Sequence, residues 1–379
     1  MEYRKLGKTG LNVSEIGLGC EHVDRKPYAQ VKETIDAALA NGINIIDCFM
    51  PGTEIRKHMA KALGDRRNSV IIQGALGSTD LRQQYDKSYD MPSVKKYFED
   101  MLQIFGYVDI AMLFNVDNDK EYEAVFAEDY LEYAFSLKQK GDIRHIGIST
   151  HQPGIAIRAI ETGIPEVLFF SLNPAFDMLP PDKNAVTLMF EGFEPSLMHG
   201  IDPTRAELYR LCEQKNIGIT VMKTLGGGKF ISPEHTPFTK PLTVQQCIHY
   251  ALTRPAVTSA LLGCQTALEV EEAMKYYTVS ASERDYTEFM GSMRNDFKGQ
   301  CVYCSHCQPC PSDIDIAAVM KHLDIARLTP NAVPLSLKEQ YARLSASGSD
   351  CIKCGLCEKR CPFGVNIIDN MAEADKIFR

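Results

Sequence analysis

The chain has no tryptophan, no long apolar run and no excess of basic charge. None of its 379 residues lies in a segment that approaches the roughly 20 consecutive apolar residues needed to cross a bilayer. The opening stretch, Met1 to Gly7, lacks the apolar core of a signal peptide. The formal net charge of −8 argues against a nucleic-acid or membrane-surface partner. We therefore expect a soluble, cytoplasmic protein that acts on a small molecule, and leave open whether it forms homo-oligomers.

The sequence also lacks a disulfide framework. Its 13 cysteines are odd in number, and no secretion signal accompanies them. Eight of them form two compact runs, each closed by a proline: Cys301, Cys304, Cys307 and Cys310 before Pro311, and Cys351, Cys354, Cys357 and Cys361 before Pro362. Zinc ribbons, the alternative, take pairs of cysteines separated by a longer loop. The spacing therefore predicts two [4Fe–4S] clusters that carry single electrons, in a low-oxygen or reducing compartment.

The fourth cysteine of each run has a separate part in this pattern. In two-cluster ferredoxins, each cluster is ligated by three cysteines of one run and the last cysteine of the other. We therefore expect Cys310 to join the second run and Cys361 to join the first. The prolines at 311 and 362 fit helices that begin there, because a proline costs no hydrogen bond in the first helical turn.

Eight short apolar runs alternate with amphipathic segments in the rest of the chain. Such runs are typical of parallel strands covered on both faces by crossover helices. Eight units over roughly 270 residues favour an α/β fold, a (β/α)8 TIM barrel whose active site lies at the carboxyl ends of the strands. We place the barrel at residues 1–285 and a small α-helical ferredoxin-like domain at 286–379. The predicted strands are Val13–Cys20, Asn44–Phe49, Ser69–Leu76, Val108–Val116, Ile143–His151, Glu166–Leu172, Asn216–Thr224 and Thr258–Cys264.

Several segments of the body resemble those of aldo-keto reductases. They are Met1–Leu11, Ile16–Gly19, Gly42–Asp47, Ile146–Ser149 and Val221–Gly228. The resemblance covers essentially the whole chain and points to the iron–sulfur branch of that family, whose barrels carry a tail with this cysteine pattern. It implies a barrel oxidoreductase.

The catalytic tetrad that the resemblance implies is largely missing. Aldo-keto reductases use Asp, Tyr, Lys and His to protonate a carbonyl while NADPH delivers hydride, and only the aspartate is matched, as Asp47. The segment 48–54 contains no tyrosine. The lysine falls at Ala75, and the histidine falls at Phe114 or Asn115. Losing the general acid costs carbonyl reduction a factor of roughly 10² to 10⁴.

The nucleotide site that the resemblance implies is also eroded. Its candidate cofactor-binding residues are Gly263, Cys264 and Gln265, in the loop after the eighth strand. This loop has no Arg or Lys to contact a 2′-phosphate, and glutamates follow it, beginning with Glu269. A helix that begins there still offers an anion site. The missing contacts argue against NAD(P)H as the hydride source.

Three further cysteines end neighbouring strands of the predicted barrel: Cys20, Cys48 and Cys264. Adjacent strands lie about 5 Å apart, so these thiols converge near Asp47 and predict an extra metal or a third cluster with one position open for substrate. The alternative is that they pack as small buried hydrophobes. Side-chain alternation would turn Cys48 away if Asp47 faces inward.

Other polar residues follow the predicted strands. Lys223 is a candidate for binding a carboxylate or phosphate, and His151 and Asn173 are candidate proton or hydrogen-bond donors. Tyr85 and Tyr89 lie in the loop after the third strand, where either one would serve as a replacement acid. The candidate catalytic set is Asp47, Cys48, His151 and Lys223.

These features predict an iron–sulfur oxidoreductase. Electrons would enter from a ferredoxin or flavoprotein, cross the tail and reach a small molecule at the barrel mouth. A second interpretation keeps NAD(P)H bound in the barrel and exchanges electrons between it and the clusters. A third is a non-catalytic electron-transfer subunit.

Overall fold

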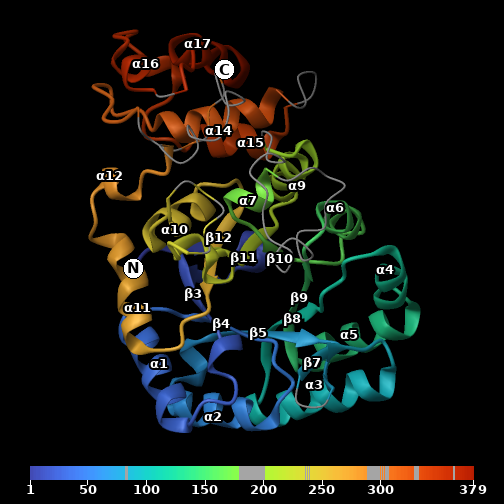
Figure 1. The fold of residues 1–379 in the computed structure, drawn as a ribbon. Coiled ribbons are helices and arrows are strands. Elements are labelled where there is room, and N and C mark those ends of the chain that lie inside the picture. The colour runs from blue at the N-terminus through green and yellow to red at the C-terminus, as the bar shows by residue number, and fades with distance from the viewer. Residues whose placement is uncertain are drawn as a thin grey trace.

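The body of the chain closes into a barrel of eight parallel strands, and the C-terminal helices pack on one side of it (Figure 1). This computed structural model describes residues 1–81, 84–178, 201–234, 236, 238, 240–287, 299, 301, 303, 307–327, 333–361 and 363–379. The strands follow one another around the ring in chain order. They are β3 (Ile16–Gly19), β4 (Ile45–Cys48), β5 (Ile71–Leu76), β8 (Val108–Leu113), β9 (Ile143–Thr150), β10 (Val167–Ser171), β11 (Gly218–Met222) and β12 (Val257–Leu262). The predicted (β/α)8 barrel is confirmed.

Alternating side chains divide each strand between two cores. Along β4, Ile45 packs inside the barrel, whereas Ile46 and Cys48 belong to the larger core between the strands and the helices. The interior is narrow at β3, where a Cβ atom on Gly17 would lie 2.1 Å from Cδ2 of Leu261. This alternation decides which residues reach the barrel interior.

An antiparallel hairpin closes the amino-terminal end of the barrel. Its strands are β1 (Tyr3–Lys5) and β2 (Asn12–Ser14). Leu6 and Val13 are fully buried and pack with the interior residues of the barrel strands. Because this end is plugged, substrate access is left to the opposite end, where the strands finish.

A layer of helices surrounds the strands. None of the helices in the described part of the chain is long and apolar enough to cross a membrane. A second hairpin, β6 (Ser78–Leu81) with β7 (Gln84–Lys87), follows β5 at the carboxyl end. The barrel helices are α1 (Tyr28–Ala40), α2 (Thr53–Leu63), α3 (Met91–Phe105), α4 (Asp119–Val125), α5 (Glu128–Lys140), α6 (Pro153–Glu161), α7 (Pro174–Asp177), α9 (Pro203–Gln214), α10 (Val244–Leu252), α11 (Ala267–Met274) and α12 (Ala281–Arg284).

The tail contains α14 (Ile316–Arg327), α15 (Leu335–Tyr341), α16 (Leu356–Arg360) and α17 (Ile367–Phe378). In Figure 1, α14 and α15 lie next to α9, and α16 and α17 lie at the outer end of the molecule. The Nζ of Lys321 on α14 lies 2.8 Å from a carboxylate oxygen of Glu213, in the last turn of α9. The proposed division at residues 285 and 286 stays a prediction, because 288–298 lie outside the described residues.

The prediction that helices begin at the two cysteine-run prolines was wrong in detail. The helix after Pro311 begins at Ile316, and the helix after the second run begins at Ile367. Asp313 has a φ of 54° and Gly364 a φ of 61°, so a left-handed residue interrupts each segment before its helix begins.

Candidate functional site

A chain of hydrogen bonds crosses the barrel interior below the mouth. The Nε2 of Gln73 donates to Oδ1 of Asp47 over 2.9 Å, and Oγ1 of Thr220 donates to Oε1 of Gln73, also over 2.9 Å. These three side chains are almost fully buried. Burial raises the pKa of Asp47 to about 7, against the lowering effect of the Gln73 hydrogen bond. Asp47 therefore exchanges a proton near neutral pH, as a general acid must.

Aromatic rings line the space above this chain. Phe49 stacks on Phe114 with ring centroids 5.7 Å apart, and Tyr85 of β7 meets the Phe49 ring edge-on at 5.0 Å. Burial raises the pKa of Tyr85 above its ordinary value, and Glu21 adds to the shift. Tyr85 is 38% exposed, so it borders solvent as well as the two phenylalanines. The mouth therefore has an apolar wall on this side.

Lys223 lies at the mouth beyond β11. Its Nζ is 3.8 Å from a carboxylate oxygen of Glu21, and both side chains remain partly exposed. Its backbone is left-handed, with a φ of 64°, and its carbonyl accepts a 2.9 Å hydrogen bond from Nδ2 of Asn173. Because Oδ1 of Asn173 also caps α7 through the Phe176 N–H, Asn173 orients the Lys223 turn and does not point into the mouth as a donor.

His151 follows β9 and is held by an aspartate that the sequence did not single out. The Nδ1 of His151 lies 3.0 Å from Oδ2 of Asp117, and its backbone N–H donates to Oδ1 of Asp117 over 2.7 Å. His151 lowers the pKa of Asp117, against the raising effect of burial. Among the described residues Nε2 of His151 has no hydrogen-bond partner, so the ring can carry a proton on that side.

The loop after β12 satisfies its own amide groups. The backbone N–H of Gln265 donates to Oε2 of Glu269 over 2.6 Å, and Oγ1 of Thr266 accepts from the Glu269 N–H. A Cβ atom on Gly263 would lie 2.4 Å from Cδ2 of His22. A carboxylate therefore occupies the position in which a phosphate would meet the start of α11, beside an imidazole ring packed on Gly263.

The three barrel cysteines are buried close to one another. Cys20, Cys48 and Cys264 lie near one another, but all three belong to the core between the strands and the helices. No group of three His, Cys, Asp or Glu side chains in the described part of the chain is arranged to hold a metal ion. Burial raises the pKa of Cys48 and of Cys264 to about 12. A third metal or cluster at the mouth therefore stays a prediction. Alternation turns Asp47 inward and Cys48 outward, which favours the alternative that these thiols pack as small buried hydrophobes.

Cysteines of both tail runs line one apolar pocket. Its wall contains the last cysteine of the first run and three cysteines of the second: Cys310, Cys351, Cys354 and Cys357. The cavity between them has a volume of about 20 Å³, which is room for about one water molecule. Cys354 is exposed and the other three are partly buried, so the pocket reaches the surface at Cys354. These four thiols are the ligands that the spacing assigned to one cluster. As the described residues are placed, no group of three or more His, Cys, Asp or Glu side chains, these cysteines included, is arranged to hold a metal ion, so the cluster stays a prediction.

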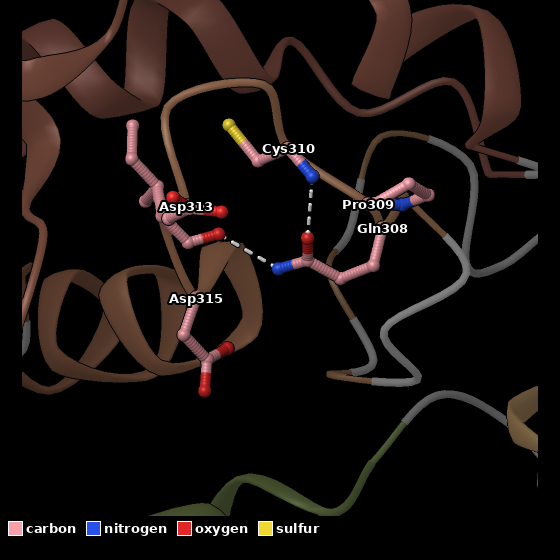
Figure 2. Close-up of a pocket in the computed structure, with 6 residues that line it drawn as sticks. Gln308, Pro309, Cys310, Asp313 and Asp315 are labelled. Carbon is pink, nitrogen blue, oxygen red and sulfur yellow. Dashed lines mark hydrogen bonds between the residues drawn. The ribbon is translucent and has the colours of Figure 1, made fainter.

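Polar contacts fix the position of Cys310, which also lines a second, more open pocket together with Gln308, Pro309, Asp313 and Asp315 (Figure 2). The amide of Gln308 bridges the turn: Oε1 accepts from the Cys310 N–H over 2.8 Å, and Nε2 donates to the Ile314 carbonyl over 2.7 Å (Figure 2). Nη1 of Arg360 donates to the carbonyls of Cys307 and Pro309. Arg360, which directly precedes Cys361, therefore connects the two cysteine runs through these hydrogen bonds.

The second predicted set is described only in part. Cys307 is buried, Cys301 and Cys361 are partly buried, and Cys304 lies outside the described residues, as does Pro362. Tyr303 is fixed in the same loop by a 2.9 Å hydrogen bond from its hydroxyl to Asp324 of α14. This set of cysteines therefore stays a prediction.

Buried aromatic and charged side chains connect that loop to the barrel. The guanidinium of Arg254 lies over the rings of Tyr303 and Tyr250. The hydroxyl of Tyr250 donates to Asp177 over 2.9 Å, and Nη1 of Arg205 bridges Asp177 and the carbonyl of Ser171. The path runs from the tail to the carboxyl end of β10, beside the barrel mouth.

Comparison with known proteins agrees with this architecture. The model of the aldo/keto reductase family matches residues 15–245. The chain belongs to the aldo-keto reductase family. It is 25% identical over 307 residues to L-galactose dehydrogenase of Arabidopsis thaliana, covering 72% of this chain and 86% of that protein. It is 29% identical over 333 residues to the uncharacterized oxidoreductase YqkF of Bacillus subtilis, covering 81% and 99%.

Solved structures share the fold of this aldo-keto reductase. A putative aldo-keto reductase from Pseudomonas aeruginosa superimposes with a TM-score of 0.54 at 18% identity, covering 73% of this chain and 95% of that one. Aldo-keto reductase AKR11C1 from Bacillus halodurans, in its holo form, gives 0.55 at 18% identity, covering 76% and 95%. At this identity the likeness concerns the barrel alone.

Two positions of the mouth can be compared with the sequence-based assignment of the family's tetrad. Ala75 lies at the inward-facing position expected for the lysine, and Phe114 at the position expected for the histidine. Sequence reasoning missed Gln73, Thr220 and Asp117. Gln73 and Thr220 are polar residues inside apolar strands, and this pattern was the available signal for a buried hydrogen-bond chain.

Proposed function

We propose that this aldo-keto reductase is an iron–sulfur oxidoreductase. Its tail holds two [4Fe–4S] clusters and its barrel binds the small molecule that receives the electrons. The observation that carries the proposal is the apolar pocket lined by Cys310, Cys351, Cys354 and Cys357. The spacing rule assigned these four cysteines, from two separate runs, to one cluster. A bound [4Fe–4S] cluster accepts and releases one electron at a time.

The residues at the mouth suit reduction without the family's tyrosine. Asp47, with a pKa of about 7, supplies the proton from inside the barrel, and Gln73 and Thr220 fix its orientation. Lys223 offers a positive charge to an anionic group of the substrate. The rings of Phe49, Tyr85 and Phe114 exclude water from one side. These features favour an apolar substrate that carries one carboxylate or phosphate.

Electrons that move from the tail to the barrel mouth would pass through the layer of helices around the barrel. Glu213 and Arg254, which contact the tail, come shortly before β11 and β12 and so lie away from the mouth. The buried chain from Tyr303 through Arg254 and Tyr250 to Asp177 supports electronic coupling across this distance, because packed aromatic rings shorten the gaps between redox groups.

Family membership favours a second candidate, an NAD(P)H-dependent reductase that exchanges electrons with the tail. The fold retains a helix that begins after β12, where a nucleotide phosphate would bind. The carboxylate of Glu269 already accepts a hydrogen bond from the Gln265 N–H there, so a phosphate could bind only if this carboxylate moved away.

Counting iron tests the first candidate. Protein purified without oxygen should contain about eight iron and eight sulfide ions per chain, and its reduced form should give the paramagnetic resonance of [4Fe–4S] clusters. The variant Cys310→Ala should retain about half of the iron, because one set loses a ligand. The control Cys247→Ala removes a buried thiol on α10 and should retain all of it.

The two candidates give different results in the same preparation. A folded wild-type protein without iron would refute the iron–sulfur proposal, and circular dichroism with a cooperative thermal transition would establish that it is folded. Two results together would support the second candidate instead. NADPH would bind tightly, as measured by the quenching of its fluorescence, and NADPH would reduce the tail.

A further inference from the structure

The outer end of the tail has an exposed surface around the one exposed cysteine of the described pocket. Ile352 and Leu356 flank Cys354 and are 65% and 41% exposed, which is unusual for large apolar side chains. Lys353 and Lys359 are exposed in the same segment. We call these four residues the α16 patch. It lies at the outer end of the molecule, on the far side of the tail from the barrel (Figure 1).

The charge of the α16 patch is opposite to that of the whole chain. The formal net charge of the protein is −8, yet the exposed charged side chains between residues 351 and 360 are both lysines. Two acids lie beside the patch, exposed Asp350 and half-buried Glu358, so residues 350–360 carry three basic and two acidic side chains, a net charge of +1. Glu358 accepts a hydrogen bond from the Ile368 N–H, and Asp350 accepts from the Ser347 N–H. An acidic partner would therefore be attracted to this end and repelled by the rest of the surface.

The two ends of the tail differ in their environment. At the inner end Tyr303 is partly buried, and the Arg254 guanidinium of the barrel lies over its ring. At the outer end the pocket reaches the surface at Cys354, amid the α16 patch. Because electron tunnelling weakens steeply with distance, the outer end is the place where a carrier protein approaches the pocket most closely.

From this geometry we infer that the α16 patch is the docking surface for a small acidic ferredoxin that supplies electrons. The inference rests on the proposed iron–sulfur function. In each encounter the ferredoxin is oxidised by one electron and the tail is reduced by one, with no bond made or broken and no proton transferred. Ile352 and Leu356 provide an apolar centre, and the two lysines provide the charged rim that steers the encounter.

A charge reversal tests this surface in the full-length protein with its iron bound. The variant Lys353→Glu/Lys359→Glu is mixed anaerobically with a reduced acidic ferredoxin, and the reduction of the tail is followed by stopped-flow absorbance. We expect its second-order rate to fall about tenfold or more, because steering contributes factors of this size. The wild-type rate should fall as salt is added, and the variant should lose this dependence.

Controls separate docking from the presence of the clusters. The variant Lys57→Glu/Lys140→Glu makes the same change in net charge on α2 and α5, on the opposite side of the molecule in Figure 1, and should react like the wild type. Dithionite, a small reductant, should reduce all three proteins at the same rate, and their iron contents should be equal.

The outcomes are distinct. If the α16 variant keeps its iron and is reduced by ferredoxin at the wild-type rate, the docking surface is wrong and the iron–sulfur function stands. If a reduced flavodoxin shows the charge dependence and the ferredoxin does not, the assignment of the partner is wrong. If the wild-type protein contains no iron, the proposed function fails and this inference fails with it.

Discussion

Asp47 keeps the family's position but occupies a changed environment. Its carboxylate accepts a hydrogen bond from a neutral amide, that of Gln73. Burial therefore dominates, and the carboxyl group holds its proton up to about pH 7. A raised pKa means that the folded state binds this proton more tightly than the unfolded chain does. The associated stability is fully present below about pH 4 and is lost as the pH rises through about 7.

This linkage predicts a pH-dependent effect of Asp47→Asn. The asparagine is isosteric and still accepts the Gln73 hydrogen bond, but it carries no charge at any pH. The variant should gain stability relative to the wild type on going from pH 5 to pH 8, by up to a few kcal/mol. Thermal unfolding of both proteins at the two pH values measures the difference. An equal difference at both pH values would show that Asp47 titrates normally. Turnover of the variant should fall by about 10² or more if Asp47 is the proton donor.

Glu269 offers a second test at a single residue. Its carboxylate accepts the Gln265 N–H in the place where a phosphate would bind. Replacing it with serine should free the amide and remove a negative charge, so NADPH affinity should rise about tenfold, as expected for one charge-assisted hydrogen bond. Fluorescence titration of NADPH measures the change. The control Glu271→Ser, on the same helix, should leave the affinity as it is, and a parallel rise there would point to net charge alone.

The β6–β7 hairpin is the element that adds most to the mouth. It brings Tyr85 onto Phe49 and Phe114, each ring pair contributing about 0.5–1.5 kcal/mol beyond buried area. We expect Tyr85→Ala to raise KM several-fold with little change in kcat, because the wall is lost and the proton donor remains. Tyr85→Phe should keep both parameters. A large fall in kcat for Tyr85→Phe would make Tyr85 the acid.

Some secondary-structure elements could be predicted from the sequence and others could not. The eight strands were predictable because buried parallel strands form continuous apolar runs, as in Ile71–Leu76 and Val108–Leu113. The β6–β7 hairpin was missed because its residues, 78–87, are mostly polar and show no apolar face. The partners of Asp47 and His151 come from other strands, and only the register around the barrel brings Gln73 and Asp117 to them.

The thiols show the limit of the same reasoning. Position along the strand correctly placed Cys20, Cys48 and Cys264 near one another, but it does not tell which face a side chain takes. The inward orientation of Asp47 fixes Cys48 on the outer face of the same strand. In the tail, four cysteines that the spacing assigned to one cluster line the same pocket, and their role as cluster ligands stays a prediction.

At the scale of the whole molecule, an ion pair joins the tail to the barrel. Lys321 and Glu213 form a partly buried ion pair 2.8 Å apart. Lys321 lowers the pKa of Glu213, against the raising effect of burial, so the pair stabilises the protein above the unfolded pKa of Glu213 and loses this effect as the pH falls through the folded value.

A double-mutant cycle measures this contact. The variants Glu213→Gln, Lys321→Met and their combination, unfolded with urea at pH 7, should give a coupling energy of about 1 kcal/mol. The glutamine retains an acceptor for the Ala256 N–H, which limits the damage to the barrel. A coupling energy of zero would indicate that aromatic packing around Arg254 alone holds the tail in place.

The interleaving of the two cysteine runs has a consequence for biosynthesis. Cys310 leaves the ribosome well before Cys351, Cys354 and Cys357, yet all four belong to the wall of one pocket. During translation the cysteines of the first run therefore remain unligated thiols until the second run emerges from the ribosome. A cluster that binds in this pocket can therefore be inserted only after most of the chain has been made. Oxygen that oxidises the thiols of the nascent chain would prevent the site from forming.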